Sequence, residues 1–153
     1  MTRALSSTAR AVTLGRALAH LQGTVEDPYA QRFLDAQSLQ KLSRWKRRAF
    51  SHSMEDLVSG WTVKWTADLI GPRTATIDEG LRTLPAGGQL VLLGAGYDAR
   101  AHRLESLSET SVFELDLPAP QNQKRAINPS WPVLAQKLVY VPCDLSSAEW
   151  PEN

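Results

Sequence analysis

The chain has 153 residues, 42% of them hydrophobic, which is enough for one compact domain with a core and too few for two. Its 17 Lys and Arg residues balance 16 Asp and Glu residues, and the net charge of +1 excludes a general attraction to nucleic acid or anionic lipid. A single cysteine, Cys143, excludes an intrachain disulfide and a cysteine-rich zinc site, and no apolar run reaches the roughly 20 residues that span a bilayer. We therefore expect a cytoplasmic protein with no membrane segment and no metal site.

The first helix is expected near the N-terminus. Apolar residues repeat there at steps of three and four, which is typical of one face of an amphipathic helix. The same segment holds arginines but no acid before Glu26, so it also fits a mitochondrial transit peptide, although the repeat favours a helix that packs. The apolar positions are Ala11, Leu14, Leu18 and Leu21.

Further helices are expected up to residue 84. Asp27 and Pro28 supply a side-chain cap and a helix-compatible proline for a second helix, which runs through Phe33 and Leu34. Gly71-Pro72 is expected to break a later helix, and a new amphipathic segment follows it. The later helix carries an apolar stripe that predicts a buried face, Leu57, Trp61, Trp65 and Leu69, and the new segment carries Ile77, Leu81 and Leu84.

The pattern changes after Pro85, where short apolar runs replace the helical repeat. Such runs are typical of fully buried strands, and the longer segments between them suit crossover helices. We therefore predict an α/β fold with a parallel βαβαβ sheet in residues 85–153, preceded by a helical cap region in residues 1–84. The expected strands are Leu90–Leu93, Val112–Leu115 and Leu138–Val141, and the expected helices are Arg100–Leu107 and Pro120–Ile127.

The residues that follow these strands predict a ligand site. Gly94-Ala95-Gly96 comes directly after the first strand, where glycines permit a tight turn and close approach of a ligand to the backbone. Asp116 ends the second strand, where a carboxylate can accept hydrogen bonds from ribose hydroxyls. Asp144 and Leu145 follow the third strand, at the position that addresses an adenine ring, although Asp144 could equally cap the strand end. Together these residues indicate an adenosine-containing ligand.

Asp98 bears on which ligand this is. Its carboxylate falls where the helix N-terminus of a dinucleotide-binding protein receives a pyrophosphate, and like charges there would repel. S-adenosylmethionine has no phosphate and carries a sulfonium and an ammonium, so it tolerates this acid better than NAD does. The alternative is that Asp98 is an ordinary acidic residue at a helix N-terminus, favoured by the macrodipole.

Five ordered motifs carry a family resemblance that covers essentially the whole chain. The chain resembles the leucine carboxyl methyltransferase-like family of class I S-adenosylmethionine-dependent methyltransferases. The resemblance implies a Rossmann-like class I methyltransferase fold, with N-terminal helices followed by a parallel sheet. The motifs are Thr8-Ala9-Arg10, Asp27-Pro28-Tyr29-Ala30 with Phe33-Leu34, Pro72-Arg73-Thr74, Leu93 to Arg100, and Phe113-Glu114-Leu115-Asp116.

The resemblance also implies roles for single residues in binding S-adenosylmethionine. An arginine suits the methionine carboxylate of the cofactor because its planar fork binds a carboxylate through two hydrogen bonds. The resemblance assigns Arg73 to this carboxylate with Arg10 as a second basic contact, Gly94 and Gly96 to the methionine part, Asp116 to the ribose, and Asp144 and Leu145 to the adenine.

The reaction implied by the resemblance is O-methylation of a carboxylate on a protein or a small molecule. A carboxylate is already ionised at neutral pH and needs no general base, so we predict no catalytic side chain. Because the family fold continues beyond a third strand, the sheet is expected to be incomplete, and the first strand to be an exposed edge that favours self-association. The alternatives are a non-catalytic fragment or interaction remnant, and a relative that binds RNA or modifies tRNA.

A cluster of basic residues motivates the nucleic-acid alternative. Basic side chains interleaved with an aromatic ring can bind phosphates and stack a base. The near-zero net charge favours an ordinary solvated helix face instead, so we expect no nucleic-acid partner. The cluster consists of Lys41, Arg44, Lys46, Arg47 and Arg48 around Trp45.

Overall fold

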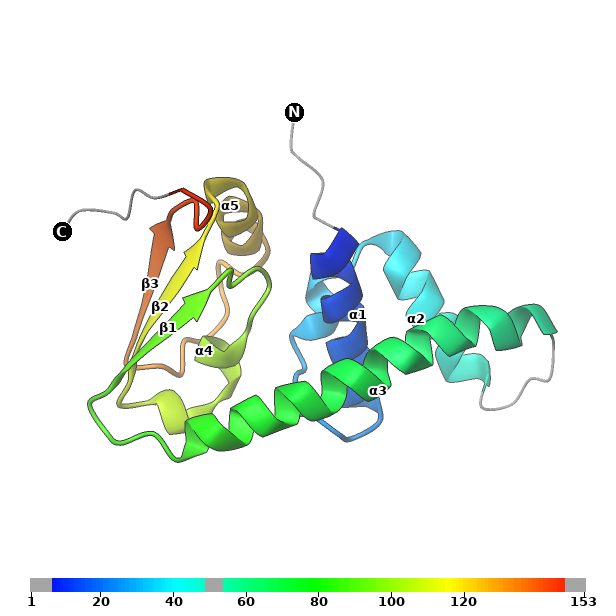
Figure 1. Ribbon diagram of the computed structural model, residues 1–153, viewed down its shortest axis with the longest axis horizontal. Coiled ribbons are helices and arrows are strands. Elements are labelled where there is room, and N and C mark those ends of the chain that lie inside the picture. The colour runs from blue at the N-terminus through cyan, green and yellow to red at the C-terminus, as the bar shows by residue number, and fades with distance from the viewer. Residues whose placement is uncertain (1–6, 49–53, 148–153) are drawn as a thin grey trace. The chain divides into compact units, whose positions relative to one another are not determined.

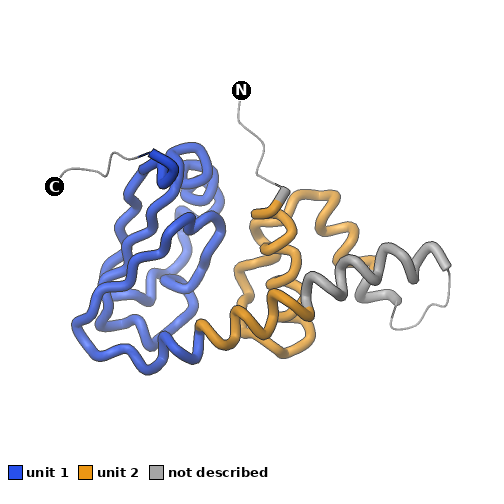
Figure 2. Tube along the Cα trace, viewed as in Figure 1, with its two compact units in different colours: residues 1–5, 78–153 blue, residues 6–77 orange. Residues whose placement is uncertain are grey.

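The computed structural model describes residues 7–48 and 54–147, and the side chains of residues 8–44 and 68–147. The chain divides into two compact units, called first and second here in chain order: the first lies within Ser6–Ile77 (orange, unit 2 in Figure 2) and the second within Asp78–Asn153 (blue, unit 1 in Figure 2). None of the described helices is both long enough and apolar enough to cross a membrane.

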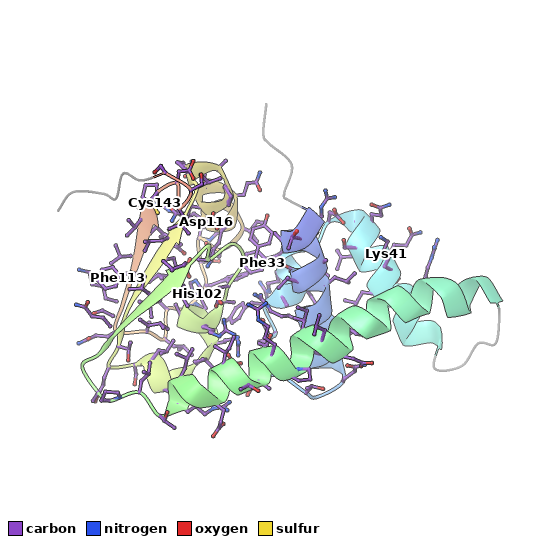
Figure 3. The ribbon with its side chains drawn as sticks, in the orientation of Figure 1. Phe33, Lys41, His102, Phe113, Asp116 and Cys143 are labelled. Carbon is purple, nitrogen blue, oxygen red and sulfur yellow. The ribbon has the colours of Figure 1, made fainter. Side chains whose placement is uncertain are left out.

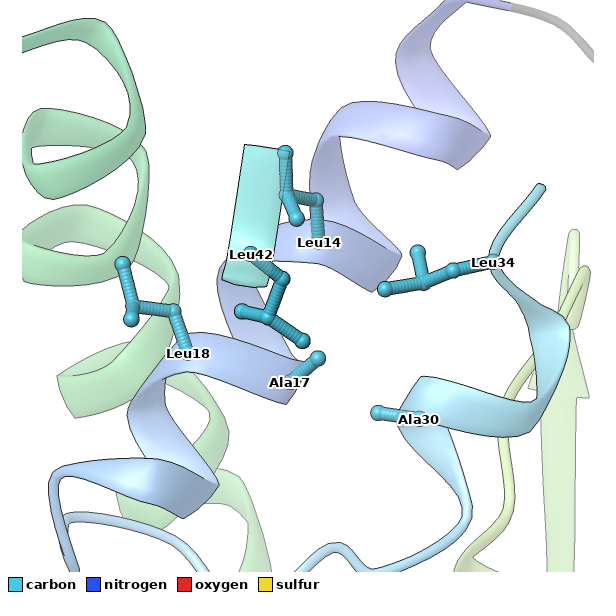
Figure 4. Close-up of a cluster of buried hydrophobic side chains, with 6 residues drawn as sticks. All are labelled: Leu14, Ala17, Leu18, Ala30, Leu34 and Leu42. Atoms are coloured by element: carbon cyan, nitrogen blue, oxygen red, sulfur yellow. The ribbon is translucent and has the colours of Figure 1, made fainter. Parts of the chain in front are cut away.

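The first unit is helical, as the sequence predicts. It contains α1 (Ser7–Leu21), a short 3₁₀ helix η1 (Ala30–Phe33), α2 (Ala36–Arg48) and most of α3 (Met54–Arg82) (Figure 1). The apolar repeat of α1 packs inward at Leu14 and Leu18, although Ala11 is exposed. The core of this unit joins α1, η1 and α2 through Leu14, Ala17, Leu18, Ala30, Leu34 and Leu42 (Figure 4).

A buried ion pair supports this core where the sequence predicts a second helix. Asp27 accepts a 3.1 Å hydrogen bond from the Ala30 N–H through Oδ1 and pairs through Oδ2 with Nε of Arg16 at 2.8 Å. The predicted cap is therefore present, but it starts a single 3₁₀ turn instead of an α-helix. Leu34 ends the turn in an extended conformation, which turns its side chain into the core.

The prediction that Gly71-Pro72 breaks a helix is wrong, because α3 continues through Pro72. A proline inside a helix removes one backbone hydrogen bond, which packing can compensate. Gly71 lies close to α1, since a Cβ placed on it would be 3.1 Å from Cβ of Ala19. The Thr74 hydroxyl also donates a 2.7 Å hydrogen bond to the Ile70 carbonyl in the turn that contains the proline.

The buried face of α3 also differs from the predicted stripe. Leu69 is 57% exposed, and the side chains of Leu57, Trp61 and Trp65 lie outside the described residues. An apolar repeat does not identify this buried face, because two of its residues are polar. Thr74 donates a hydrogen bond to the Ile70 carbonyl, and Asp78 forms an ion pair with Arg100. The buried positions of the described part of α3 are Ile70, Gly71, Thr74, Asp78 and Leu81, whereas Ile77 and the following Leu84 are exposed.

The second unit contains the predicted parallel sheet. Strands β1 (Gln89–Leu93), β2 (Ser111–Asp116) and β3 (Lys137–Pro142) each include one predicted run, and they pair in the order β1-β2-β3. The first crossover is broken into α4 (Arg100–Arg103) and a 3₁₀ helix η2 (Glu105–Leu107). The break lies at Leu104, whose extended backbone places its side chain in the core.

Helix α5 (Pro118–Ile127) forms the second crossover and starts two residues earlier than predicted. The core of this unit lies between the helices and one face of the sheet (Figure 1). Its buried members are Leu81, Ala101, Leu104, Leu107, Val112 and Ala135, with Leu90, Leu92 and Leu138 packed against them. On the edge strand β1, Val91 and Leu93 are exposed, and self-association through this edge stays a prediction.

Candidate cofactor-binding site

The glycine loop has the backbone conformation that its sequence predicts. Gly94 and Gly96 have φ angles of 60° and 49°, in the left-handed backbone region that residues with a Cβ rarely adopt. The loop is tied to the neighbouring strand by a 3.1 Å hydrogen bond from the Ala95 N–H to the Leu115 carbonyl. The turn therefore brings the backbone that follows β1 back to the carboxyl end of β2.

Asp116 joins this loop directly. The Gly96 N–H donates a 2.6 Å hydrogen bond to Oδ2 of Asp116, and the Leu117 N–H donates a 2.7 Å hydrogen bond to Oδ1. An ionised carboxylate accepts about four hydrogen bonds, so each oxygen keeps one direction for a ribose hydroxyl. A Cβ on Gly96 would lie 3.8 Å from the Gly94 carbonyl oxygen and 4.0 Å from Oδ2 of Asp116, so it would fill the space beside the carboxylate. The arrangement fits the adenosine part of a cofactor.

The third strand ends at the same edge of the sheet. The Cys143 N–H donates a 2.9 Å hydrogen bond to the Asp116 carbonyl, and Figure 3 shows these two residues at one end of β2 and β3. Asp144 and Leu145 follow, both exposed. Their place next to Asp116 suits the predicted role, and the contact with adenine stays a prediction.

Asp144 also shapes the turn in which it lies. Its Oδ1 accepts hydrogen bonds from the Ser146 N–H at 2.9 Å and from the Ser146 hydroxyl at 2.6 Å. These hydrogen bonds lower the pKa of the Asp144 carboxyl below its ordinary value. The side chain therefore stays ionised to a lower pH than an ordinary aspartate, and an ionised carboxylate suits an acceptor of hydrogen bonds.

Asp98 is part of a buried network of charges. It accepts a 2.8 Å hydrogen bond from the Arg100 N–H and also pairs with the Arg100 guanidinium, whose Nε binds Oδ1 of Asp78 at 2.7 Å. Burial opposes the charge of Arg100, but the two carboxylates outweigh this effect and raise its pKa. Asp98 precedes the N-cap Ala99 of the four-residue helix α4, so its ion pair with Arg100 accounts for its position better than the macrodipole of a helix does. Arg103 completes the network through a 2.7 Å ion pair with Asp78.

The two predicted arginines lie in the first unit. Arg10 is on α1, where its Nη1 lies 3.4 Å from Oδ2 of Asp35, and both side chains are about two-fifths exposed. Arg73 is exposed on α3. The glycine loop belongs to the second unit, so the predicted contacts of both arginines with a cofactor stay predictions.

Sequence reasoning missed a buried ion pair under this site. Nζ of Lys124 on α5 lies 2.5 Å from Oε2 of Glu114 on β2, and both side chains are fully buried. Burial raises the pKa of Glu114, and the Lys124 charge partly opposes this shift. No local pattern reveals the pair, because the partners belong to different elements. A lysine on the buried side of a crossover helix is the one available signal.

Comparison with known proteins gives the site its family context. The model of the leucine carboxyl methyltransferase family matches residues 9–153. The chain belongs to the leucine carboxyl methyltransferase family. Its glycine loop and Asp116 therefore lie in a methyltransferase-type sheet, as the resemblance predicts.

Curated relatives of this family member are bacterial proteins with the provisional name of S-adenosylmethionine-dependent methyltransferases. A relative from Mycobacteroides abscessus is 39% identical in an alignment 127 residues long, which covers 79% of this chain and 40% of that protein. One from Mycobacterium avium is 34% identical in an alignment 117 residues long, which covers 74% of this chain and 38% of that protein. One from Mycobacterium tuberculosis is 32% identical in an alignment 154 residues long, gaps included, which covers 96% of this chain and 50% of that protein. The chain thus matches half or less of the length of these relatives.

The basic cluster of this family member lies on α2. Lys41 and Arg44 are exposed, as a solvated helix face requires. The side chains of residues 45–48, Trp45 among them, lie outside the described residues. The expectation that nucleic acid is not a partner stays a prediction.

Proposed function

We propose that this protein is an S-adenosylmethionine-dependent methyltransferase that binds its cofactor at the carboxyl ends of β1, β2 and β3. The hydrogen bond between Gly96 and Asp116 carries the proposal, because it joins a left-handed glycine turn to a carboxylate that can hold a ribose. Asp144 and Leu145 would flank the adenine from the neighbouring strand end. S-adenosylmethionine would supply the methyl group, and these residues would bind and orient it.

The local electrostatics favour this cofactor over a dinucleotide. A pyrophosphate needs the N-terminus of a sizeable helix or basic groups, whereas α4 has only four residues and Arg100 is already paired with Asp78 and Asp98. The Asp98 charge is in turn compensated by Arg100, so Asp116 is the carboxylate beside the loop that suits the positive charges of S-adenosylmethionine.

Arg73 and Arg10 are proposed to bind the methionine carboxylate of the cofactor. A guanidinium presents two parallel N–H groups to a carboxylate and stays charged at all physiological pH values. The exposure of Arg73 on α3 leaves its fork accessible to a ligand. Arg10 would exchange its long contact with Asp35 for the ligand.

A carboxylate of a protein or small molecule is the methyl acceptor that we propose. The family name points to this class, and an ionised carboxylate attacks the methyl carbon without losing a proton first. Both described histidines are engaged elsewhere. His102 donates to the Pro132 carbonyl at 2.8 Å, and His20 accepts from the Asp27 N–H at 3.3 Å. This chemistry needs neither of them as a base.

Calorimetric titration with S-adenosylhomocysteine tests cofactor binding. Asp116→Ala should weaken binding by about 1–3 kcal/mol, the usual cost of losing a charged hydrogen-bond partner. Glu79→Ala removes an exposed carboxylate on α3, paired with Arg82, and should leave binding unchanged. Equal losses in both variants would contradict the proposed site.

Transfer of a radiolabelled methyl group tests the acceptor. Peptides with a free carboxyl terminus should be labelled and their amidated forms should not. The label should be released as methanol in alkali, because a methyl ester hydrolyses there. Alkali-stable label would contradict carboxylate methylation while leaving methyl transfer intact.

A further inference from the structure

Gln121 bridges the carboxyl ends of two strands. This residue lies in the first turn of α5, and its side chain is buried, with 5% exposure. Its amide nitrogen donates a 2.8 Å hydrogen bond to the Glu114 carbonyl on β2 and a 3.0 Å hydrogen bond to the Val141 carbonyl on β3. One neutral amide therefore uses both of its N–H groups to hold β2 to β3 next to the point where both strands end.

The bridge lies immediately below two residues of the proposed site. Glu114 is two positions before Asp116, and Val141 is three positions before Asp144. Beyond the bridge, where the two strands end, the Cys143 N–H donates a 2.9 Å hydrogen bond to the Asp116 carbonyl. The β2–β3 ladder extends to the pair Asp116 and Pro142. The Cys143 backbone hydrogen bond and the Gln121 amide add to this ladder where the two strands end, and so help to set the spacing between the two carboxylates.

We propose that Gln121 is a positioning residue for the cofactor site, which holds Asp116 and Asp144 at the separation that the adenosine part requires. The inference rests on the proposed function, because it assigns both carboxylates to one ligand. Gln121 itself is buried beneath the strand ends and acts only through them.

The chemistry of the amide is specific to this position. Methionine has similar length and volume but donates no hydrogen bond, so it would leave two buried carbonyls without this donor. An ionised glutamate would place a negative charge against the same carbonyls. A protonated glutamate regains one donor, and burial shifts its pKa upward toward neutral pH.

Gln121→Met with a matched control tests the proposal. Asn122→Leu also removes one amide from α5, but at an exposed position. In fully folded chain, Gln121→Met should raise the Kd for S-adenosylhomocysteine by about threefold to tenfold, and Asn122→Leu should not change it. The Cys143 amide should also exchange its hydrogen faster in Gln121→Met than the change in global unfolding explains.

Gln121→Glu is a second variant, and its readout is the pH dependence of the Kd for S-adenosylhomocysteine, which a purely structural role would not produce. Its Kd should approach the wild-type value as the pH falls from about 8 to about 5, because the protonated carboxyl can donate again. Unchanged Kd and unchanged Cys143 exchange in Gln121→Met would overturn the positioning role. Failure of the wild-type chain to bind S-adenosylhomocysteine would overturn the proposed function, and with it the ligand part of this inference. Exchange at Cys143 would still decide whether Gln121 holds the strand ends.

Discussion

The Gly96 N–H donates a 2.6 Å hydrogen bond to Oδ2 of Asp116, 20 residues further along the chain. The parallel register places Leu93 opposite Leu115, so the residues that follow the two strands meet at the same edge of the sheet. Gly96 makes this contact with its backbone in the left-handed region, at a φ of 49°.

Gly96→Ala should therefore destabilise the chain by about 1–2 kcal/mol, because a Cβ disfavours the left-handed conformation. Gly80→Ala is the matched control, since Gly80 lies within α3 and a Cβ there would meet no atom within 4 Å. The control should stabilise the chain by about 0.5–1 kcal/mol through helix propensity. Urea unfolding of both variants measures the difference, and a stabilising Gly96→Ala would contradict the assigned loop conformation.

Lys124→Met should be strongly destabilising, by about 3–5 kcal/mol, because it leaves the buried Glu114 carboxyl without its ion-pair partner. Replacing both partners, as Glu114→Gln with Lys124→Met, should cost less than Lys124→Met alone. Chemical denaturation monitored by circular dichroism measures both. If Lys124→Met does not fold, recovery of a folded chain in the double variant tests the same coupling, and equal losses in both variants would argue against it.

The stability of the chain should depend on pH through His102. Burial lowers the pKa of His102 below its ordinary value, and the nearby Lys124 charge acts in the same direction, while the hydrogen bond to Pro132 and the Asp98 charge oppose both. The folded chain therefore resists a proton that the unfolded chain accepts below about pH 6.5. Stability is full above that pH and is lost as the pH falls toward the folded-state pKa, by up to about 1.4 kcal/mol per pH unit.

Urea unfolding between pH 8 and pH 5.5 measures this contribution. His102→Gln should lower the stability at pH 8 and flatten its loss below pH 6.5, because glutamine does not titrate. An unchanged slope in the variant would assign the pH dependence to other groups.

Arg73→Lys should weaken binding of S-adenosylhomocysteine by about tenfold, because lysine keeps the charge but loses one of two hydrogen bonds to the carboxylate. Methylthioadenosine lacks that carboxylate and provides the control, so its Kd should not change in the variant. Calorimetry on both ligands measures the difference. Equal weakening of the two ligands would place Arg73 outside the carboxylate site.

The elements of the sheet could be predicted from the sequence because their signals are local. The run Leu90–Leu93 is apolar at every position and is bounded by turn residues, which predicts a strand. The expectation that such runs are fully buried is wrong for this edge strand, because Val91 and Leu93 are exposed. The structure confirms all three strands and extends each by one or two residues. The helices are harder to predict. Local preference predicts that a helix ends at Pro72, but α3 continues through this residue. Packing of Gly71 against α1 outweighs that preference.

The sequence alone identifies the residues that can form the site in the second unit, namely the two glycines, Asp116 and Asp144. Their chemistry and their positions after strands can be read along the chain. The hydrogen bond from Gly96 to Asp116 and the bridge that Gln121 forms between β2 and β3 become visible in the folded chain. These contacts join residues 7 to 20 positions apart, and no local propensity encodes the register that brings them together. They form because aligned parallel strands place their carboxyl ends at one edge, where a single side chain can reach two of them.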